Sequence, residues 1–449
     1  MDIYNIKDQT LKNFEKVKDQ IIEIGDDIFS HPELGFKEYR TSNIVKEFLR
    51  ENGIPFKDGL AITGVMGEIK FSEDGPNIAV FGELDAVISP EHPHRDKETN
   101  AAHACGHHSQ IANLLALARV LNDPPFKGHL KGKITLFAVP AEEYVEIEYR
   151  LRLKKEGKIK YPGGKQEFIR LGLLDNVDIA MMLHAKDNTP EKVVEVGGTS
   201  NGFIGKKVVF KGKEAHAGYA PEKGVNALNA AQVALNGLNS IRETLRDEDH
   251  IRIHPIITKG GDIVNIIPQE VKMESYVRGK SIEAIKDASD KFDWAMIGGA
   301  IAIGARVDIE NIPGYMPLYN EERLTDIFRK NAITLLGKKN VFDIGHFSAS
   351  TDMGDVSQII PSIHPSGGGY EGSAHTKDFK VVDREMAYIM PAKLYALTII
   401  DLLSDKGKLA KEIIDTWEPK ITKEKYLKTL DSFFERKTID RKNCIFNNS

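Results

Sequence analysis

Residues 77–84, with the sequence NIAVFGEL, form an apolar run that predicts a buried strand. Two more runs of this kind follow, KITLFAV at 133–139 and VDIAMML at 177–183. Between the first two runs, apolar side chains recur at the spacing of one helix face, at Ile111, Leu114, Leu115, Ala118 and Leu121. The order strand, helix, strand predicts an α/β fold with a mixed, mostly parallel sheet.

The segments on either side extend this pattern. Two helices are expected before the first strand, one from Leu11 to Phe29 and one over 42–52. After Gly197 we expect strands at 203–212, 250–259, 270–279 and 305–312, with helices at 228–245 and 282–303. The resulting order β-α-β-β-α-β describes a ferredoxin-like α+β layer. We therefore expect an inserted domain at 197–314 and a discontinuous catalytic domain at 1–196 and 315–449, with a charged, helical segment from Lys406 onward.

Composition narrows the functional classes. The chain has 449 residues and a net charge of -5, which disfavours a nucleic-acid partner. No apolar run reaches the roughly 18–20 residues that span a bilayer, and the N-terminus lacks the pattern of a secretion signal. The two cysteines, Cys105 and Cys444, lie far apart in the sequence. They do not resemble a disulfide framework, so we expect a reducing cytoplasm. Because no apolar run is long enough to span a bilayer, we expect no membrane partner.

Chemically capable side chains follow each apolar run. Asp85 comes after the first run, Glu142 and Glu143 after the second, and His184 ends the third. Ligands of open α/β sheets bind beyond the carboxyl ends of the strands, so these side chains are expected to meet at one edge. The cluster HACGHH at 103–108 precedes the central helix and joins them there. This convergence predicts a metal site.

Each of these residues also has a simpler interpretation. Cys105 could be a small buried side chain, and His107 could be solvated. A helix N-terminus, however, favours the thiolate that a metal requires. Adjacent acids such as Glu142 and Glu143 usually lie at the surface, but at the end of a buried strand an unpaired charge is costly. One carboxylate could bind an ion while the other takes a proton from the attacking water. A lone His184 would more often be structural.

Further candidates lie later in the chain. The glycine-rich stretch 367–372 allows close approach of the backbone to a ligand at Gly368, and His375 after it could complete a metal site. In the inserted domain, His216 lies within EAHAG, between a strand and a helix. Asn265 and Arg278 follow on the next two strand segments, and an amide with a fixed guanidinium can hold a carboxylate. Arg278 could equally be a solvated strand residue.

Eight motifs in order resemble a family of dinuclear metallopeptidases that includes aminoacylases, glutamate-releasing carboxypeptidases and auxin-conjugate amidohydrolases. They are HPELGF at 31–36, GELDAV at 82–87, HACGHH at 103–108, PAEE at 140–143, LHA at 183–185, EAHAG at 214–218, GGDIVNIIP at 260–268 and SAHTKDF at 373–379. The segment ASTDMGDVS at 349–357 is similar to the aminobenzoyl-glutamate hydrolase and aminoacyl-dipeptidase subgroup. The resemblance implies a zinc-peptidase-like catalytic domain, with helices on both faces of its sheet, and an inserted lid domain.

The resemblance also implies a ligand set and catalytic roles. Two divalent ions, Zn²⁺ or Mn²⁺, would be held by Cys105, His107, Glu143, His184 and His375. Cys105 would bind both ions, His107 and His375 one of them, and Glu143 and His184 the other. The remaining implied roles are Glu142 as general base and later acid, His216 as oxyanion donor, Asn265 and Arg278 as carboxylate-binding residues, and Asp85 as the residue that orients a ligand histidine.

The function implied is metal-dependent hydrolysis of an amide bond in a dipeptide, an N-acyl amino acid or an aminobenzoyl-glutamate type substrate. A homodimer formed through the lid domain is expected on the same ground. The alternatives are a catalytically silent metal-binding or scaffold protein on this fold and a nucleotide-dependent enzyme, for which no phosphate-binding glycine motif is present. Two features depart from the family. His108 stands where an acid or amide is usual, and the segment 144–170 is long and basic, so it could form a lid, a rim or a solvated helix.

Overall fold

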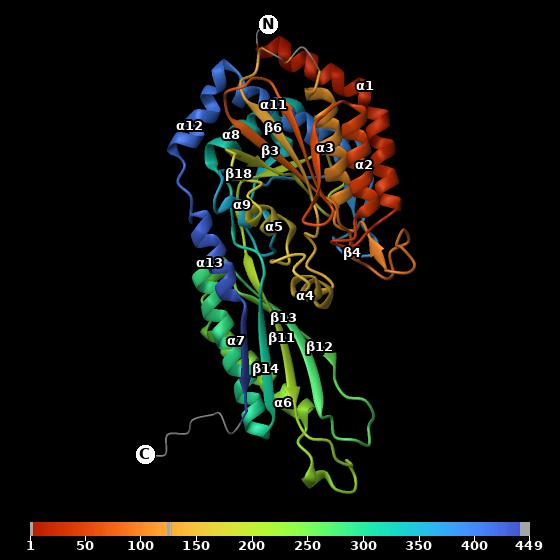
Figure 1. The fold of residues 1–449 in the computed structure, drawn as a ribbon, viewed down its shortest axis with the longest axis vertical. Coiled ribbons are helices and arrows are strands. Elements are labelled where there is room, and N and C mark those ends of the chain that lie inside the picture. Colours follow the sequence, from red (N-terminus) through yellow and green to blue (C-terminus); the bar gives the residue numbers. More distant parts are fainter. Residues whose placement is uncertain (1–2, 124–125, 127, 441–449) are drawn as a thin grey trace. The chain divides into compact units, whose positions relative to one another are not determined.

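The computed structural model describes residues 3–123, 126 and 128–440 and divides into two compact units (Figure 1). Unit 1 comprises Met1–Gly198, Tyr319–Gly345 and Asp355–Lys423. Unit 2 comprises Thr199–Leu318, His346–Gly354 and the chain from Glu424 onward. Cys444, one of the two cysteines considered above, lies outside the described residues.

Unit 1 is built on a six-stranded mixed sheet with the order β1-β2-β6-β3-β7-β18. Its strands are β1 (Phe56–Leu60), β2 (Gly64–Lys70), β3 (Asn77–Glu83), β6 (Lys133–Val139), β7 (Ile179–Met181) and β18 (Ser362–Ile363). The three apolar runs form β3, β6 and β7, and these strands pair in parallel, as the sequence predicted. β2 pairs antiparallel with β6, and β1 pairs antiparallel with β2, so the sheet is mixed.

Successive side chains of β3 and β6 point to opposite sides of the sheet. Because both strands are almost entirely buried, helices cover both faces. Ile78 and Val80 of β3 belong to the main apolar core, together with Leu115 of α3 (His107–Leu121). On the other face, the rings of Phe81 and Phe137 stack with centroids 5.0 Å apart. Phe168 of α5 (Gly164–Arg170) packs on Phe137 at 5.6 Å.

The remaining helices of unit 1 surround this core. They are α1 (Ile3–Ser30), α2 (Tyr39–Glu51), α4 (Ile147–Lys155), α8 (Glu322–Leu336), α10 (Arg384–Tyr388), α11 (Met390–Leu403) and α12 (Lys408–Thr416). Arg384–Leu403 was not predicted as a membrane span, yet among the described residues it is the one segment long and apolar enough to cross a membrane. Its apolar window is 94% buried in the structure, as in the core helix of a globular unit.

Unit 2 contains a five-stranded antiparallel sheet with the order β12-β13-β11-β14-β22. Its elements are β11 (Gly202–Lys211), α6 (Ala227–Ile241), β12 (Arg252–Lys259), β13 (Glu270–Gly279), α7 (Ile282–Ile303), β14 (Arg306–Pro313), α13 (Lys423–Phe433) and β22 (Glu435–Ile439). Val208, Met273 and Val307 of the sheet share an apolar core with Ala231 of α6 and Phe292 of α7. The strand β22 was not predicted, because its sequence ERKTI is mostly charged.

The remaining strands are short and form small separate sheets. They are β4 (Val87–Ile88), β5 (Ala101–Ala102), β8 (His184–Ala185), β9 (Val194–Val196), β10 (Thr199–Ser200), β15 (Leu318–Tyr319), β16 (Val341–Asp343), β17 (His346–Phe347), β19 (Ser366–Gly367), β20 (Tyr370–Glu371) and β21 (Lys380–Val381). One single-turn helix, α9 (Met353–Ser357), lies within the 349–357 motif. In unit 1, β8 pairs in parallel with β19, so His184 is bonded to the strand that leads into the glycine-rich stretch.

The start of α5 lies so close to the residue that follows β6 that no side chain fits at Gly164. A Cβ at this position would overlap the carbonyl oxygen of Pro140. We expect Gly164→Ala to destabilise the protein by about 1–3 kcal/mol, the usual cost of overpacking, and to lower the Tm. Gly298 of α7 is the matched control because a Cβ there meets nothing within 4 Å. Gly298→Ala should leave the Tm unchanged or raise it, and equal Tm losses in both variants would contradict this account.

Candidate metal centre

Asp85 contacts two other predicted site residues of unit 1, His107 and Glu143. It follows β3, and its carbonyl oxygen and Oδ1 lie 2.9 and 3.2 Å from Nδ1 of His107, so Nδ1 must donate to them. Its Oδ2 accepts a hydrogen bond of 2.8 Å from the backbone N–H of Glu143. Since Nδ1 carries the proton of a neutral His107 ring, Nε2 is left as the lone-pair nitrogen. The Asp85 contacts therefore fix both the orientation and the tautomer of His107.

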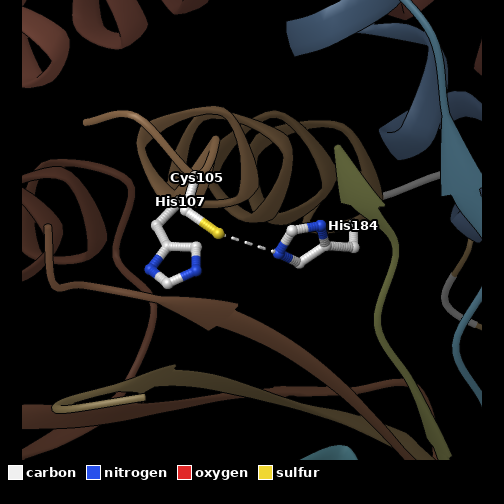
Figure 2. A group of neighbouring side chains, drawn as sticks. All are labelled: Cys105, His107 and His184. Carbon is white, nitrogen blue, oxygen red and sulfur yellow. Dashed lines mark hydrogen bonds between the residues drawn. The ribbon is translucent and has the colours of Figure 1, made fainter. Parts of the chain in front are cut away.

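Cys105 lies at the meeting point of two histidines. Its Sγ is 3.5 Å from Nε2 of His184 and 3.4 Å from Nε2 of His375. Figure 2 shows Sγ directed toward the His184 ring, with the His107 ring beside it. Nδ1 of His184 lies 2.8 Å from the carbonyl oxygen of Ala185 and donates to it, which again leaves Nε2 as the coordinating nitrogen.

Two groups of donor atoms suited to a metal ion share this sulfur. In one, the ligand atoms of Cys105, His107 and His184 lie within 4.8 Å of one another. In the other, the same holds for Cys105, Glu143 and His375, with Nε2 of His375 at 3.1 Å from Oε1 of Glu143. The resemblance implied a different partition, with His107 beside His375 and Glu143 beside His184. Position along the chain could not reveal which side of the sulfur each ring occupies.

Two buried atoms in these groups support the fit to a cation. Nε2 of His107 and Oε1 of Glu143 are buried and make no hydrogen bond, although charged groups lie within 3.1 Å of each. Buried polar atoms are otherwise nearly always satisfied. A thiolate, three imidazoles and a carboxylate form a donor set that suits Zn²⁺, and the carboxylate also suits Mn²⁺.

The electrostatics of the cluster favour the ligand forms of its anions. Burial and Glu143 act to raise the pKa of the Cys105 thiol, but His184 and His107 outweigh them and lower it to about 6. Burial also acts to raise the pKa of Glu143, whereas the charge of His375 lowers it to about 2. The same carboxylate raises the pKa of His375 to about 11. These shifts favour the anionic forms of Cys105 and Glu143.

Glu142 lies beside this cluster, close to His107. Its Oε2 is 3.9 Å from Nε2 of His107, and the residue is only 8% exposed. It follows Ala141, whose φ of +58° is a left-handed conformation that a residue with a side chain seldom adopts. The guanidinium of Arg150 donates to the carbonyl oxygens of Ala141, Glu143 and Val145. This buried cation holds the turn that presents the two acids.

A second buried cation, which was not predicted from the sequence, lies next to the cluster. Nζ of Lys165 lies 2.6 Å from Oε1 of Glu83, and both side chains are fully buried. Oε2 of Glu83 accepts from Nε2 of Gln110 at 2.9 Å and lies 3.0 Å from Nε2 of His107. The acid inside the apolar run NIAVFGEL was the available signal for Glu83.

The segment 144–170 is thus neither a simple solvated helix nor only a rim. Lys165 and Phe168 of α5 are fully buried, and so is Arg150 of α4.

His108, which stands where the family usually has an acid or an amide, has a packing role. Its ring is buried against Phe29 and Tyr388, at centroid distances of 4.9 and 5.8 Å. Among the described residues, the donor groups do not include His108.

Gly368 is accounted for by packing within unit 1. A Cβ there would overlap the carbonyl oxygen of Glu191, and its N–H donates to the carbonyl oxygen of Val193 at 3.0 Å. Its expected contact with a substrate stays a prediction.

The other three predicted residues lie in unit 2. Nδ1 of the exposed His216 accepts from the N–H groups of Gly218 and Tyr219, at 3.2 and 3.0 Å, so a neutral ring carries its proton on Nε2. The carbonyl oxygen of Asn265 accepts from the N–H of Ala217 at 2.9 Å, which brings Asn265 beside the His216 loop.

Arg278 lies elsewhere in unit 2, on β13. Its Nη1 donates to Oγ of Ser350 at 2.7 Å, and its guanidinium lies over the rings of Phe203 and Tyr276. These contacts fix the guanidinium in place, which distinguishes it from a freely solvated strand residue. The roles of Arg278, His216 and Asn265 toward a substrate stay predictions.

Comparison with known proteins adds a family match. Residues 79–400 match the model of peptidase family M20/M25/M40. The chain is 28% identical over 305 residues to N-acetylcysteine deacetylase from Bacillus subtilis, covering 66% of this chain and 75% of that protein. It is 30% identical over 295 residues to thermostable carboxypeptidase 1 from Saccharolobus solfataricus, covering 63% and 69%.

The fold is also similar to solved structures. One is a dinuclear metal-binding peptidase from Bacillus subtilis, with a TM-score of 0.65 and 24% identity. The match covers 87% of this chain and 99% of that one. At this identity the similarity concerns the fold.

Proposed function

Because the chain belongs to peptidase family M20/M25/M40, and is therefore a hydrolase, we propose that it cleaves the amide bond of a small N-acyl or aminoacyl amino acid with the help of two divalent cations. The observation that carries this proposal is the convergence of five donor side chains, Cys105, His107, Glu143, His184 and His375, beside Glu142. The relatives whose names specify a deacetylase and a carboxypeptidase support the substrate class.

The two donor groups define which residues would hold the cations. Cys105, His107 and His184 would hold one, and Cys105, Glu143 and His375 the other. Zn²⁺ or Mn²⁺ bound there would polarise the amide carbonyl and make water a better nucleophile at neutral pH. Asp85 would keep His107 oriented through the hydrogen bonds to its Nδ1.

Glu142 would move the proton. One carboxylate oxygen takes a proton from water as the water oxygen attacks the carbonyl carbon. The same carboxyl group then gives the proton to the amide nitrogen as the C–N bond breaks, which yields a carboxylate and an amine. The buried, Arg150-held turn supports this role because a fixed carboxylate loses little freedom when it reacts.

Unit 2 would supply the substrate contacts. We assign it as the ferredoxin-like lid, inserted at about 197–314, that also forms a homodimer. His216 would donate from Nε2 to the oxyanion, and Asn265 with Arg278 would hold the substrate carboxylate. The support is that His216 already has the required tautomer, and that Ser350 and two aromatic rings fix Arg278.

We infer the cellular location from the thiol. Cys105 is a free, buried cysteine that the proposed site needs in its reduced form. We therefore assign the enzyme to the reducing cytoplasm.

A metal-dependent hydrolysis screen tests the function. The protein is stripped with a chelator and then given Zn²⁺ or Mn²⁺ singly, with N-acyl amino acids, dipeptides and aminobenzoyl-glutamate as substrates. We expect cleavage that disappears with the metal and returns with it. Tight metal binding without cleavage of any member of this panel would instead support the catalytically silent alternative. Retention of Glu142 argues against that alternative, because metal binding alone does not require a second acid.

A further inference from the structure

The Glu83–Lys165 pair is an ion pair inside the protein next to the proposed metal centre. Both side chains have no exposed surface, and the separation of 2.6 Å between Nζ and Oε1 is that of a charge-assisted hydrogen bond. Its members come from the end of β3 and the start of α5, two elements on which the site is built. Since desolvating two charges is expensive, an ion pair at this place adds little to stability on its own.

The two carboxylate oxygens of Glu83 make different contacts. Oε1 is held by Lys165, whereas Oε2 accepts a hydrogen bond from Nε2 of Gln110 at 2.9 Å and faces Nε2 of His107 at 3.0 Å. Nε2 is the nitrogen that the Asp85 contacts leave as a lone pair, and it makes no hydrogen bond. Oε2 of Glu83 therefore lies beside the atom through which His107 would bind a cation.

A third group of donor atoms follows from this placement. The ligand atoms of Glu83, His107 and Glu142 lie within 4.8 Å of one another, and all three residues are buried. This group shares His107 with the Cys105–His107–His184 group. Within this group, Glu83 is anchored by the buried cation of Lys165.

We propose that Glu83 is an auxiliary carboxylate ligand of the cation held by His107, and that Lys165 is the positioning residue that leaves only Oε2 of Glu83 available to it. This inference rests on the proposed metal-dependent function. Lys165 also offsets one negative charge in a site that already contains the Cys105 thiolate and the Glu143 carboxylate. The pair would thereby set the affinity of one of the two cation sites.

Metal affinity tests the role of Glu83 directly. The stripped protein is titrated with Zn²⁺ in competition with a chromophoric chelator. We expect Glu83→Gln to bind one equivalent about 10- to 100-fold more weakly than the wild type, the range seen when a supporting group of a metal site is removed. The other equivalent should bind unchanged, since Glu83 does not belong to the Cys105–Glu143–His375 group.

Thermal stability tests the role of Lys165. Lys165→Met removes the cation that pairs with Glu83, so its Tm without metal should fall, and added Zn²⁺ should raise its Tm by more than it raises that of the wild type. Lys206→Met in unit 2 is the control, because Lys206 and Asp293 form an equally short pair of 2.6 Å with side-chain exposures of 0% and 2%, and Asp293 also contacts Lys437 at 2.8 Å. This control should lose Tm but gain only the wild-type increment from Zn²⁺.

The outcomes separate the inference from the function on which it rests. If the wild type binds no divalent cation, the proposed function fails. If the wild type binds two equivalents and Glu83→Gln binds both with unchanged affinity, the inference is overturned and the proposed function stands. If Glu83→Gln does not fold, Lys165→Met decides: a Zn²⁺-induced gain in Tm no larger than that of the wild type overturns the inference.

Discussion

Replacing Glu142 with glutamine is expected to lower kcat by about 10³-fold, within the range of about 10²–10⁴ for losing a positioned general base. The amide is nearly the same size as the carboxylate, so the turn held by Arg150 should persist. It cannot take a proton from water or return one to the leaving nitrogen. Both cations should stay bound, because Glu142 belongs to neither of the two groups that contain Cys105, and Glu83 and His107 of the third group remain.

The measurement is kcat at saturating substrate, with metal content determined on the same samples. Glu156→Gln is the control, because Glu156 is an exposed acid at the end of α4 that pairs with Lys158 at the surface. This variant should keep kcat within about twofold, since a substitution at an exposed position away from the site usually has a small effect on the protein. A Glu142→Gln enzyme that retains a tenth or more of the wild-type kcat would rule out the proposed proton transfer.

Replacing Cys105 with alanine is expected to weaken both cation sites. Its Sγ is the one atom common to the two groups, at 3.5 Å from Nε2 of His184 and 3.4 Å from Nε2 of His375. We expect affinity for each equivalent to fall by about 10²-fold or more, beyond the effect of losing a supporting residue. Activity at a metal concentration that saturates the wild type should fall with it.

The chain's other cysteine provides the control for this substitution. Cys444→Ala removes a thiol that the proposed site does not include, so it should leave metal content and kcat unchanged. Metal analysis after dialysis, followed by titration of metal back into the assay, distinguishes the variants. Two equivalents bound to Cys105→Ala with wild-type affinity would show that the sulfur is not a shared ligand.

Fold prediction succeeded where the apolar pattern is local and continuous. β6, β13 and α7 have the bounds that the sequence indicated, because each is a single run with one periodicity. It failed for β2, which pairs antiparallel with β6, and for β22. β22 has a charged sequence and becomes a strand by pairing with β14 more than a hundred residues earlier, which no local pattern can indicate.

Site prediction had a similar limit. The position of Glu143 and His184 after buried strands was enough to predict that both lie near one edge of the sheet, where each belongs to a donor group that contains Cys105. The grouping of His107 with His184 depends on how rings are turned about the sulfur. The Glu83–Lys165 pair joins residues 82 positions apart, and a basic residue in a charged segment gives no sign that it will be buried.

Anomalous scattering from a crystal of the protein grown with Zn²⁺ tests the central claim most directly. The account predicts two peaks in the anomalous difference map. One should lie among Cys105, His107 and His184 and the other among Cys105, Glu143 and His375, each about 2.0–2.3 Å from its ligand atoms. A map in which these side chains surround no peak, or in which the peaks lie on other residues, would contradict it.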